Sequence, residues 1–154
     1  MVDDVVAVRD SAGVAEAIYW GYSMGSAIGL DLAIRHASRF SSFIFGGISP
    51  YQWPEAIVEP LIPIRQSLVG KSEADVAVLD ALINRRPLTD NDLTSIDVPC
   101  LFYCGDKDPF YAGAEECARH IHNARFVSLA GANHVGVKAD QVIPHVKQFL
   151  TDIS

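Results

Sequence analysis

The sequence predicts an α/β fold in which a mostly parallel sheet carries helices on both faces. Short apolar runs alternate with helix-like segments along the chain, and this order is typical of strands joined by helical crossovers. Within the apolar runs, hydrophobic residues fill most positions and do not alternate strictly with polar ones. Such filling is typical of strands that helices cover on both sides.

The chain of 154 residues is long enough for one domain, and we expect a single unit over residues 1–154. Its content of 49% hydrophobic residues excludes an intrinsically disordered chain. The formal net charge of −7 disfavours a nucleic-acid partner, because phosphate backbones are themselves negative. No apolar run reaches the roughly 20 residues of a membrane span, so no membrane partner is expected.

Several classes of protein are excluded by what the sequence lacks. The first ten residues contain three aspartates and no basic start of a signal peptide, which predicts a cytoplasmic location. Cys100, Cys104 and Cys117 follow no paired pattern, and we expect buried, reduced thiols. No phosphate loop, dinucleotide fingerprint or H-E-x-x-H motif is present. The sequence therefore predicts neither a cofactor nor a bound metal.

Strand and helix signals divide most of the chain into separate elements. Residues 3–12 fit a short helix with Asp3 or Asp4 as N-cap and Gly13 as its end, although the Val-Val-Ala-Val run would suit a strand equally. Four apolar runs are predicted as strands: Ala17–Trp20, Phe43–Phe45, Cys100–Cys104 and Arg125–Leu129. Apolar residues at helical spacing predict helices over Met24–Ile34, 114–121 and 142–153.

Residues 49–97 interrupt this alternation. They contain five prolines and no convincing strand. They do contain a helix signal near 73–84, at the start of which Ser72 and Asp75 have the spacing of a capping pair. We expect a helical insertion that lies over one edge of the sheet.

The sharpest chemical signal is the segment Gly21-Tyr22-Ser23-Met24-Gly25, which matches the pattern G-x-S-x-G. In this pattern a serine nucleophile sits on a strained turn between a strand and a helix. A predicted strand precedes the segment and a buried helix follows it. We expect both glycines to be required, because the turn brings chain segments too close for a Cβ.

A serine nucleophile needs a base and an orienting acid, and the chain offers both downstream. Asp106 and Asp108 follow the strand at Cys100–Cys104, and His134 follows the last strand. Because the carboxyl ends of parallel strands meet at one edge of the sheet, these residues should gather near Ser23. The spacing alone leaves both aspartates open as the acid.

Through these segments the sequence resembles the α/β-hydrolase family over its whole length. GYSMGS looks like the nucleophile turn, PCLFYCGDKDPF like the acid-bearing loop and LAGANHVG like the histidine loop. The resemblance implies Ser23 as nucleophile and His134 as general base and acid. It implies Asp108 rather than Asp106 as the acid, because the family's acid usually ends a G-x-x-D pattern. The backbone N–H of Met24 is implied as an oxyanion-hole donor.

The resemblance also implies a cap and a substrate pocket. Residues 49–97 correspond to the family's cap. Four aromatic residues are candidate pocket walls, although ordinary packing would explain them as well: Tyr22, Tyr51, Trp53 and Phe110.

Two departures from the family pattern stand out. Ser26 occupies a position where many relatives have another glycine. The family also has further strands and an oxyanion loop before the nucleophile turn. We therefore expect a truncated fold that begins at the helix before the nucleophile strand and lacks a second oxyanion donor.

The predicted function is that of a cofactor-free serine hydrolase, which cleaves small carboxylic esters, thioesters or lactones through an acyl-enzyme. The alternative is a truncated scaffold, weakly active or inactive, that acts as an oligomerisation or binding module. In a truncated fold Ala17–Trp20 becomes an exposed apolar edge of the sheet, which can pair with another chain. We therefore expect a homodimer or larger oligomer through this edge.

Overall fold

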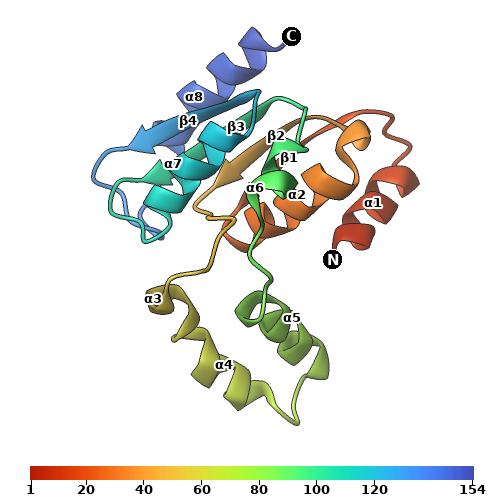
Figure 1. The fold of residues 1–154 in the computed structure, drawn as a ribbon. Coiled ribbons are helices and arrows are strands. Elements are labelled where there is room, and N and C mark those ends of the chain that lie inside the picture. The colour runs from red at the N-terminus through yellow and green to blue at the C-terminus, as the bar shows by residue number, and fades with distance from the viewer.

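A four-stranded parallel sheet forms the centre of the computed structural model, which describes all residues, 1–154 (Figure 1). Its strands lie in the order in which they occur along the chain: β1 (Ala17–Tyr22), β2 (Phe40–Gly46), β3 (Cys100–Gly105) and β4 (Ala124–Leu129). All three pairings are parallel. The predicted α/β class is confirmed, and each predicted strand is present with ends that extend by up to three residues.

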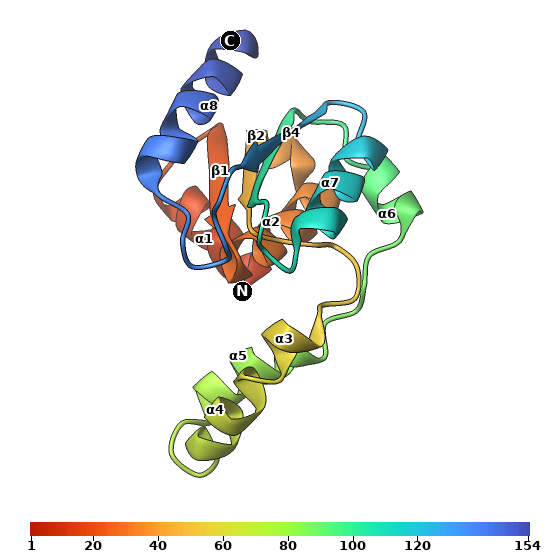
Figure 2. The same ribbon diagram turned by 90° about the vertical axis from the view of Figure 1, so that its left-hand side faces the viewer.

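Helices cover both faces of the sheet, as Figure 2 shows edge-on. On one face lie α1 (Val2–Ser11), α2 (Met24–Arg35) and α7 (Tyr111–His120), whose apolar side chains join the larger core cluster. On the other face α8 (Ala139–Asp152) packs alone against β3 and β4. Between α2 and β2 the chain makes a short 3-10 turn, η1 (Ala37–Arg39).

The first segment is a helix and not a strand. Met1, rather than Asp3 or Asp4, is the residue before its first turn, and no side chain caps it. The two aspartates lie in the first turn, where negative charge favours the helix dipole. Gly13 follows the helix with a φ of +67°, a conformation that glycine adopts without steric cost.

The insertion between β2 and β3 contains four short helices: α3 (Glu55–Val58), α4 (Leu61–Leu68), α5 (Glu73–Ile83) and α6 (Asp90–Thr94). Figures 1 and 2 show α3, α4 and α5 as an arm that projects away from the sheet, so they do not lie over its edge as expected. The two ends of the insertion do pack on the body, with Trp53 and Leu93 buried in the core. Ser72 caps α5 by accepting a hydrogen bond from the Asp75 N–H at 3.4 Å.

Strand β1 is an edge of the sheet and pairs only with β2. Because α8 covers only the β3–β4 half of this face of the sheet, Ile18 and Trp20 on β1 keep 49% of their surface exposed.

Cys100, Cys104 and Cys117 are buried free thiols. None of the helices combines the length and the apolar character that crossing a membrane would require.

Candidate active site

Ser23 lies on a sharp turn where β1 ends and α2 begins. Its φ of +52° and ψ of −114° make it the only residue other than glycine with a positive φ. Such a conformation is strained and persists where the surroundings enforce it. The Ser23 N–H donates to the carbonyl oxygen of Gly46 at 2.8 Å, which fastens the turn to the end of β2.

Of the two glycines in the motif, only Gly21 is required by close packing. A Cβ on Gly21 would lie 2.5 Å from the carbonyl carbon of Gly25, which belongs to the first turn of α2. A Cβ on Gly25 would meet no atom within 4 Å. The expectation that both glycines avoid a clash is therefore wrong for Gly25.

Ser26 stabilises the same turn from the buried side. Its hydroxyl lies 2.8 Å from the carbonyl oxygen of Gly21 and 2.9 Å from that of Gly46, and it accepts a hydrogen bond from the Gly46 N–H at 2.9 Å. Tyr19 also stabilises the turn, because its hydroxyl donates a hydrogen bond to the Gly25 carbonyl at 2.7 Å. The serine at position 26, where many relatives have glycine, thus links β1, β2 and α2.

Three side chains from three strand ends form one hydrogen-bonded line. His134 Nε2 lies 2.9 Å from Ser23 Oγ, and His134 Nδ1 lies 2.8 Å from Asp108 Oδ2. The Asp108 side chain is fully buried, and that of His134 is 20% exposed. The second oxygen of Asp108 accepts from the Phe110 N–H at 2.9 Å, which fixes the carboxylate. The imidazole can therefore exchange a proton with Ser23 while Asp108 orients it.

Asp106, the competing carboxylate, braces the histidine loop instead. Its Oδ1 accepts a hydrogen bond from the Gly131 N–H at 2.9 Å. Next to it, the Lys107 N–H donates to the Ala132 carbonyl at 3.0 Å. The two contacts hold the loop that carries His134 against the loop that carries Asp108.

The first turn of α2 presents backbone donors beside Ser23. The helical hydrogen bonds begin with the Ala27 N–H, which donates to the Ser23 carbonyl at 3.0 Å. The N–H groups of Met24, Gly25 and Ser26 therefore precede the helical ladder. The Met24 N–H directly follows Ser23, in the place that the sequence predicts for an oxyanion donor.

The four aromatic residues expected to line a substrate pocket are not gathered in one cavity. Phe110 is buried against the imidazole of His134, with ring centroids 5.3 Å apart. Trp53 packs on Phe110 inside the core. Tyr51 points to α7, where its hydroxyl lies 3.3 Å from His120 Nδ1. Tyr22 alone lines a cavity, on the α8 face of the sheet.

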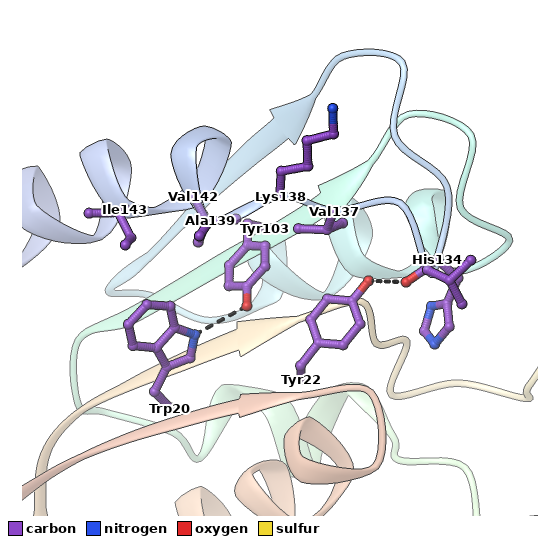
Figure 3. A pocket seen from close by; sticks show the side chains of 10 residues that line it. Trp20, Tyr22, Tyr103, His134, Val137, Lys138, Ala139, Val142 and Ile143 are labelled. Atoms are coloured by element: carbon purple, nitrogen blue, oxygen red, sulfur yellow. Dashed lines mark hydrogen bonds between the residues drawn. The ribbon is translucent and has the colours of Figure 1, made fainter.

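That cavity has a volume of about 590 Å³ and is mostly apolar. Figure 3 shows Trp20, Tyr22 and Tyr103 of the strands on one side of it and Val142 and Ile143 of α8 on the other, with the Tyr22 hydroxyl directed to His134. The cavity occupies the part of the sheet that α8 leaves uncovered. The sequence signal for it was the spacing of two aromatic residues in β1, Trp20 and Tyr22, which share one face of the strand.

No group of three or more His, Cys, Asp or Glu side chains lies in an arrangement that could hold a metal ion. Burial, with a smaller contribution from the charge of Asp108, raises the pKa of Tyr22 above its ordinary range. The Tyr22 hydroxyl beside His134 is therefore a proton-bearing donor at neutral pH.

Comparison with known proteins agrees with this architecture. The family model of the alpha/beta hydrolase fold matches residues 1–77, which is half of the chain. The chain belongs to the α/β-hydrolase fold family, as its resemblance predicted. A search of curated protein sequences found no significant match.

Solved structures extend the likeness over the whole chain. An enol-lactonase from Burkholderia xenovorans LB400 is 23% identical, with a TM-score of 0.71, and the match covers 97% of this chain and 71% of that one. A thermophilic esterase from Thermogutta terrifontis is 16% identical, with a TM-score of 0.81 and coverage of 99% and 71%. MenH from S. aureus is 18% identical, with a TM-score of 0.76 and coverage of 99% and 74%. Each of these chains is longer than the present one, and at these identities the likeness concerns the fold.

Proposed function

We propose that the chain is a serine hydrolase that cleaves small carboxylic esters, thioesters or lactones through Ser23, His134 and Asp108. The observation that carries the proposal is the continuous line of hydrogen bonds, 2.9 Å from Ser23 to His134 and 2.8 Å from His134 to Asp108. The strained conformation of Ser23 at the end of β1 supports it, because it exposes the hydroxyl at the edge where ligands reach a parallel sheet.

In the proposed reaction His134 accepts the Ser23 hydroxyl proton at Nε2 while Oγ attacks the carbonyl carbon of the substrate. The negative oxygen of the tetrahedral intermediate accepts a hydrogen bond from the Met24 N–H. His134 then gives its proton to the leaving alcohol or thiol, and an acyl ester remains on Ser23. A water molecule that His134 deprotonates hydrolyses this ester and regenerates the hydroxyl.

Esters, thioesters and lactones fit this site better than amides, because an alkoxide or thiolate leaves more easily than an amine. Two structural neighbours, an enol-lactonase and an esterase, support the same bond types. Met24 supplies one oxyanion donor.

The test is the hydrolysis of p-nitrophenyl acetate by the wild type and by the variants Ser23→Ala and His134→Ala. Each variant should lose the turnover above background, since each removes a group that takes part in bond formation or proton transfer. His145→Ala, on the exposed side of α8, is the matched control and should keep it. Equal turnover by the wild type and Ser23→Ala would refute the proposal.

A second candidate function, assembly through β1, is favoured by the open edge of the sheet. The strand Ala17–Tyr22 contains neither a charged residue nor a proline, the two features that usually protect an edge strand. The apolar cavity beside Trp20 adjoins this edge. We propose that a second copy pairs with β1 in antiparallel orientation, because an edge strand is complementary to itself in that arrangement.

Sedimentation at micromolar concentration tests this assembly. The expected mass is at least twice the 16.7 kDa of one chain. Ile18→Lys places a charge on the edge strand and should shift the equilibrium toward the monomer. A monomeric wild type would contradict the proposed pairing without bearing on the hydrolase chemistry.

A further inference from the structure

The histidine loop, residues 130–137, has to cross the sheet to bring His134 to Ser23. It leaves β4, and two strands separate β4 from β1. Three interstrand gaps correspond to about 14 Å. Asp106 anchors the beginning of the loop through Gly131. At the far end, the Tyr22 hydroxyl donates a hydrogen bond to the backbone carbonyl of His134 itself (Figure 3).

A pair of glycines lets Tyr22 reach that carbonyl. Tyr22, Gly46 and Tyr103 lie in one row across β1, β2 and β3. A Cβ on Gly46 would lie 2.3 Å from the Tyr103 ring, and one on Gly47 would lie 2.8 Å from the Tyr22 ring. With no side chain on β2 in the way, the two tyrosine rings stack at a centroid distance of 6.1 Å.

The Tyr22 ring also touches the imidazole. The two ring centroids are 5.4 Å apart at an interplanar angle of 32°. The edge of Phe110 contacts the imidazole as well, at 5.3 Å and 69°. His134 is thus held by aromatic rings from two different elements, while its backbone carbonyl is held by the Tyr22 hydroxyl.

We propose that Tyr22 is a positioning residue for His134, and this inference rests on the proposed hydrolase function. The hydroxyl fixes the height of the histidine backbone over the sheet, and the ring fixes the tilt of the imidazole. Because Tyr22 directly precedes Ser23, one strand end sets the positions of both partners in the 2.9 Å contact between Ser23 and His134. Tyr22 then acts on the reaction through His134, in addition to lining the cavity on the α8 face of the sheet.

The test compares Tyr22→Phe, which keeps the ring and removes the hydroxyl, with Tyr103→Phe as matched control. Tyr103 lies in the same stack, but its hydroxyl accepts from Trp20 Nε1 at 3.1 Å and does not reach the histidine loop. Two experiments are done on each variant: steady-state kinetics, which give kcat and KM for p-nitrophenyl acetate, and amide hydrogen exchange of residues 130–137.

For Tyr22→Phe we expect kcat to fall about tenfold, the effect of one ordinary hydrogen bond, with KM unchanged. Exchange in residues 130–137 should accelerate in the same variant, and Tyr103→Phe should change neither quantity. A raised KM with unchanged kcat, or exchange equal to that of the wild type, would overturn the inference. A wild type without turnover would refute the proposed function, and the exchange comparison would then decide alone whether Tyr22 holds the loop.

Discussion

Replacing Gly21 by alanine is expected to displace Ser23 from His134, with which it forms a hydrogen bond of 2.9 Å. The new Cβ would lie 2.5 Å and 2.6 Å from the carbonyl carbon and oxygen of Gly25, and 2.7 Å from the Ser26 nitrogen. The shortest of these contacts falls 0.9 Å below the 3.4 Å at which ordinary contact begins. All three atoms belong to the backbone, so no side-chain rotation relieves the clash. The first turn of α2, and Ser23 with it, must therefore move by nearly this amount.

The size of the effect follows from that displacement. A misplacement of about 1 Å between reacting groups costs on the order of 10²-fold in rate. Overpacking of this kind lowers the free energy of unfolding by about 1–3 kcal/mol. The matched variant is Gly25→Ala, where the Cβ meets nothing within 4 Å and alanine is the better helix former by about 0.5–1 kcal/mol.

Both glycine variants are compared by urea unfolding and by p-nitrophenyl acetate turnover. Gly21→Ala should be less stable and at least tenfold slower than Gly25→Ala. If the two variants are equally stable and equally active, close packing at Gly21 does not hold the nucleophile in place, and the reasoning is refuted.

Three further predictions concern single side chains. Asp108→Asn should lower kcat by about 10³–10⁴, because both oxygens of Asp108 accept hydrogen bonds, from the Phe110 N–H and from His134 Nδ1, and asparagine replaces one of them by an NH2 group that cannot accept. Asp106→Asn keeps the one oxygen that the Gly131 N–H needs and should stay within about tenfold of the wild type in steady-state kinetics; equal losses would contradict the assignment. Ser26→Ala leaves buried backbone groups of β1 and β2 without their partner and should cost about 1–3 kcal/mol in chemical denaturation, so an unchanged midpoint would count against it. Burial raises the pKa of Cys100 from 9.0 to about 12, so above pH 9.0 the unfolded chain loses the Cys100 proton that the folded chain keeps. This thiol alone lowers the free energy of unfolding by up to about 1.4 kcal/mol per pH unit, and the burial of Cys104 and Cys117, which raises the pKa of each, adds to the slope. Urea unfolding between about pH 8 and pH 11 measures this slope, which should be shallower in Cys100→Ala and would be the same if the thiol were not responsible.

The strands could be predicted because burial on both faces leaves a continuous apolar run in the sequence. β3, at Cys100–Gly105, is buried at every position, and it is the segment whose sequence pattern is plainest. The arm formed by α3, α4 and α5 could not be placed in this way. In a helix that does not pack on the sheet, the spacing of apolar residues does not mark a face that contacts the sheet. The direction of such a helix depends on the two chain segments that connect it to the body.

The candidate site was predictable in outline because its members follow strand ends, and parallel strands end at one edge. The choice between Asp106 and Asp108 was not decided by position, since both follow β3 and only the course of the turn decides which one reaches His134. The roles of Ser26 and Tyr22 depend on contacts with residues 20 and 112 positions away in the sequence. Local spacing contains no trace of such contacts.

The most direct test of the central claim is the reaction of the intact chain with a fluorophosphonate, followed by mass spectrometry and peptide mapping. A serine activated by His134 and Asp108 displaces fluoride and forms a covalent phosphonate ester. We predict one adduct per chain, located on Ser23, absent from Ser23→Ala and strongly slowed in His134→Ala. A chain that gains no adduct, or gains it on another residue, would contradict the assignment of Ser23 as the nucleophile.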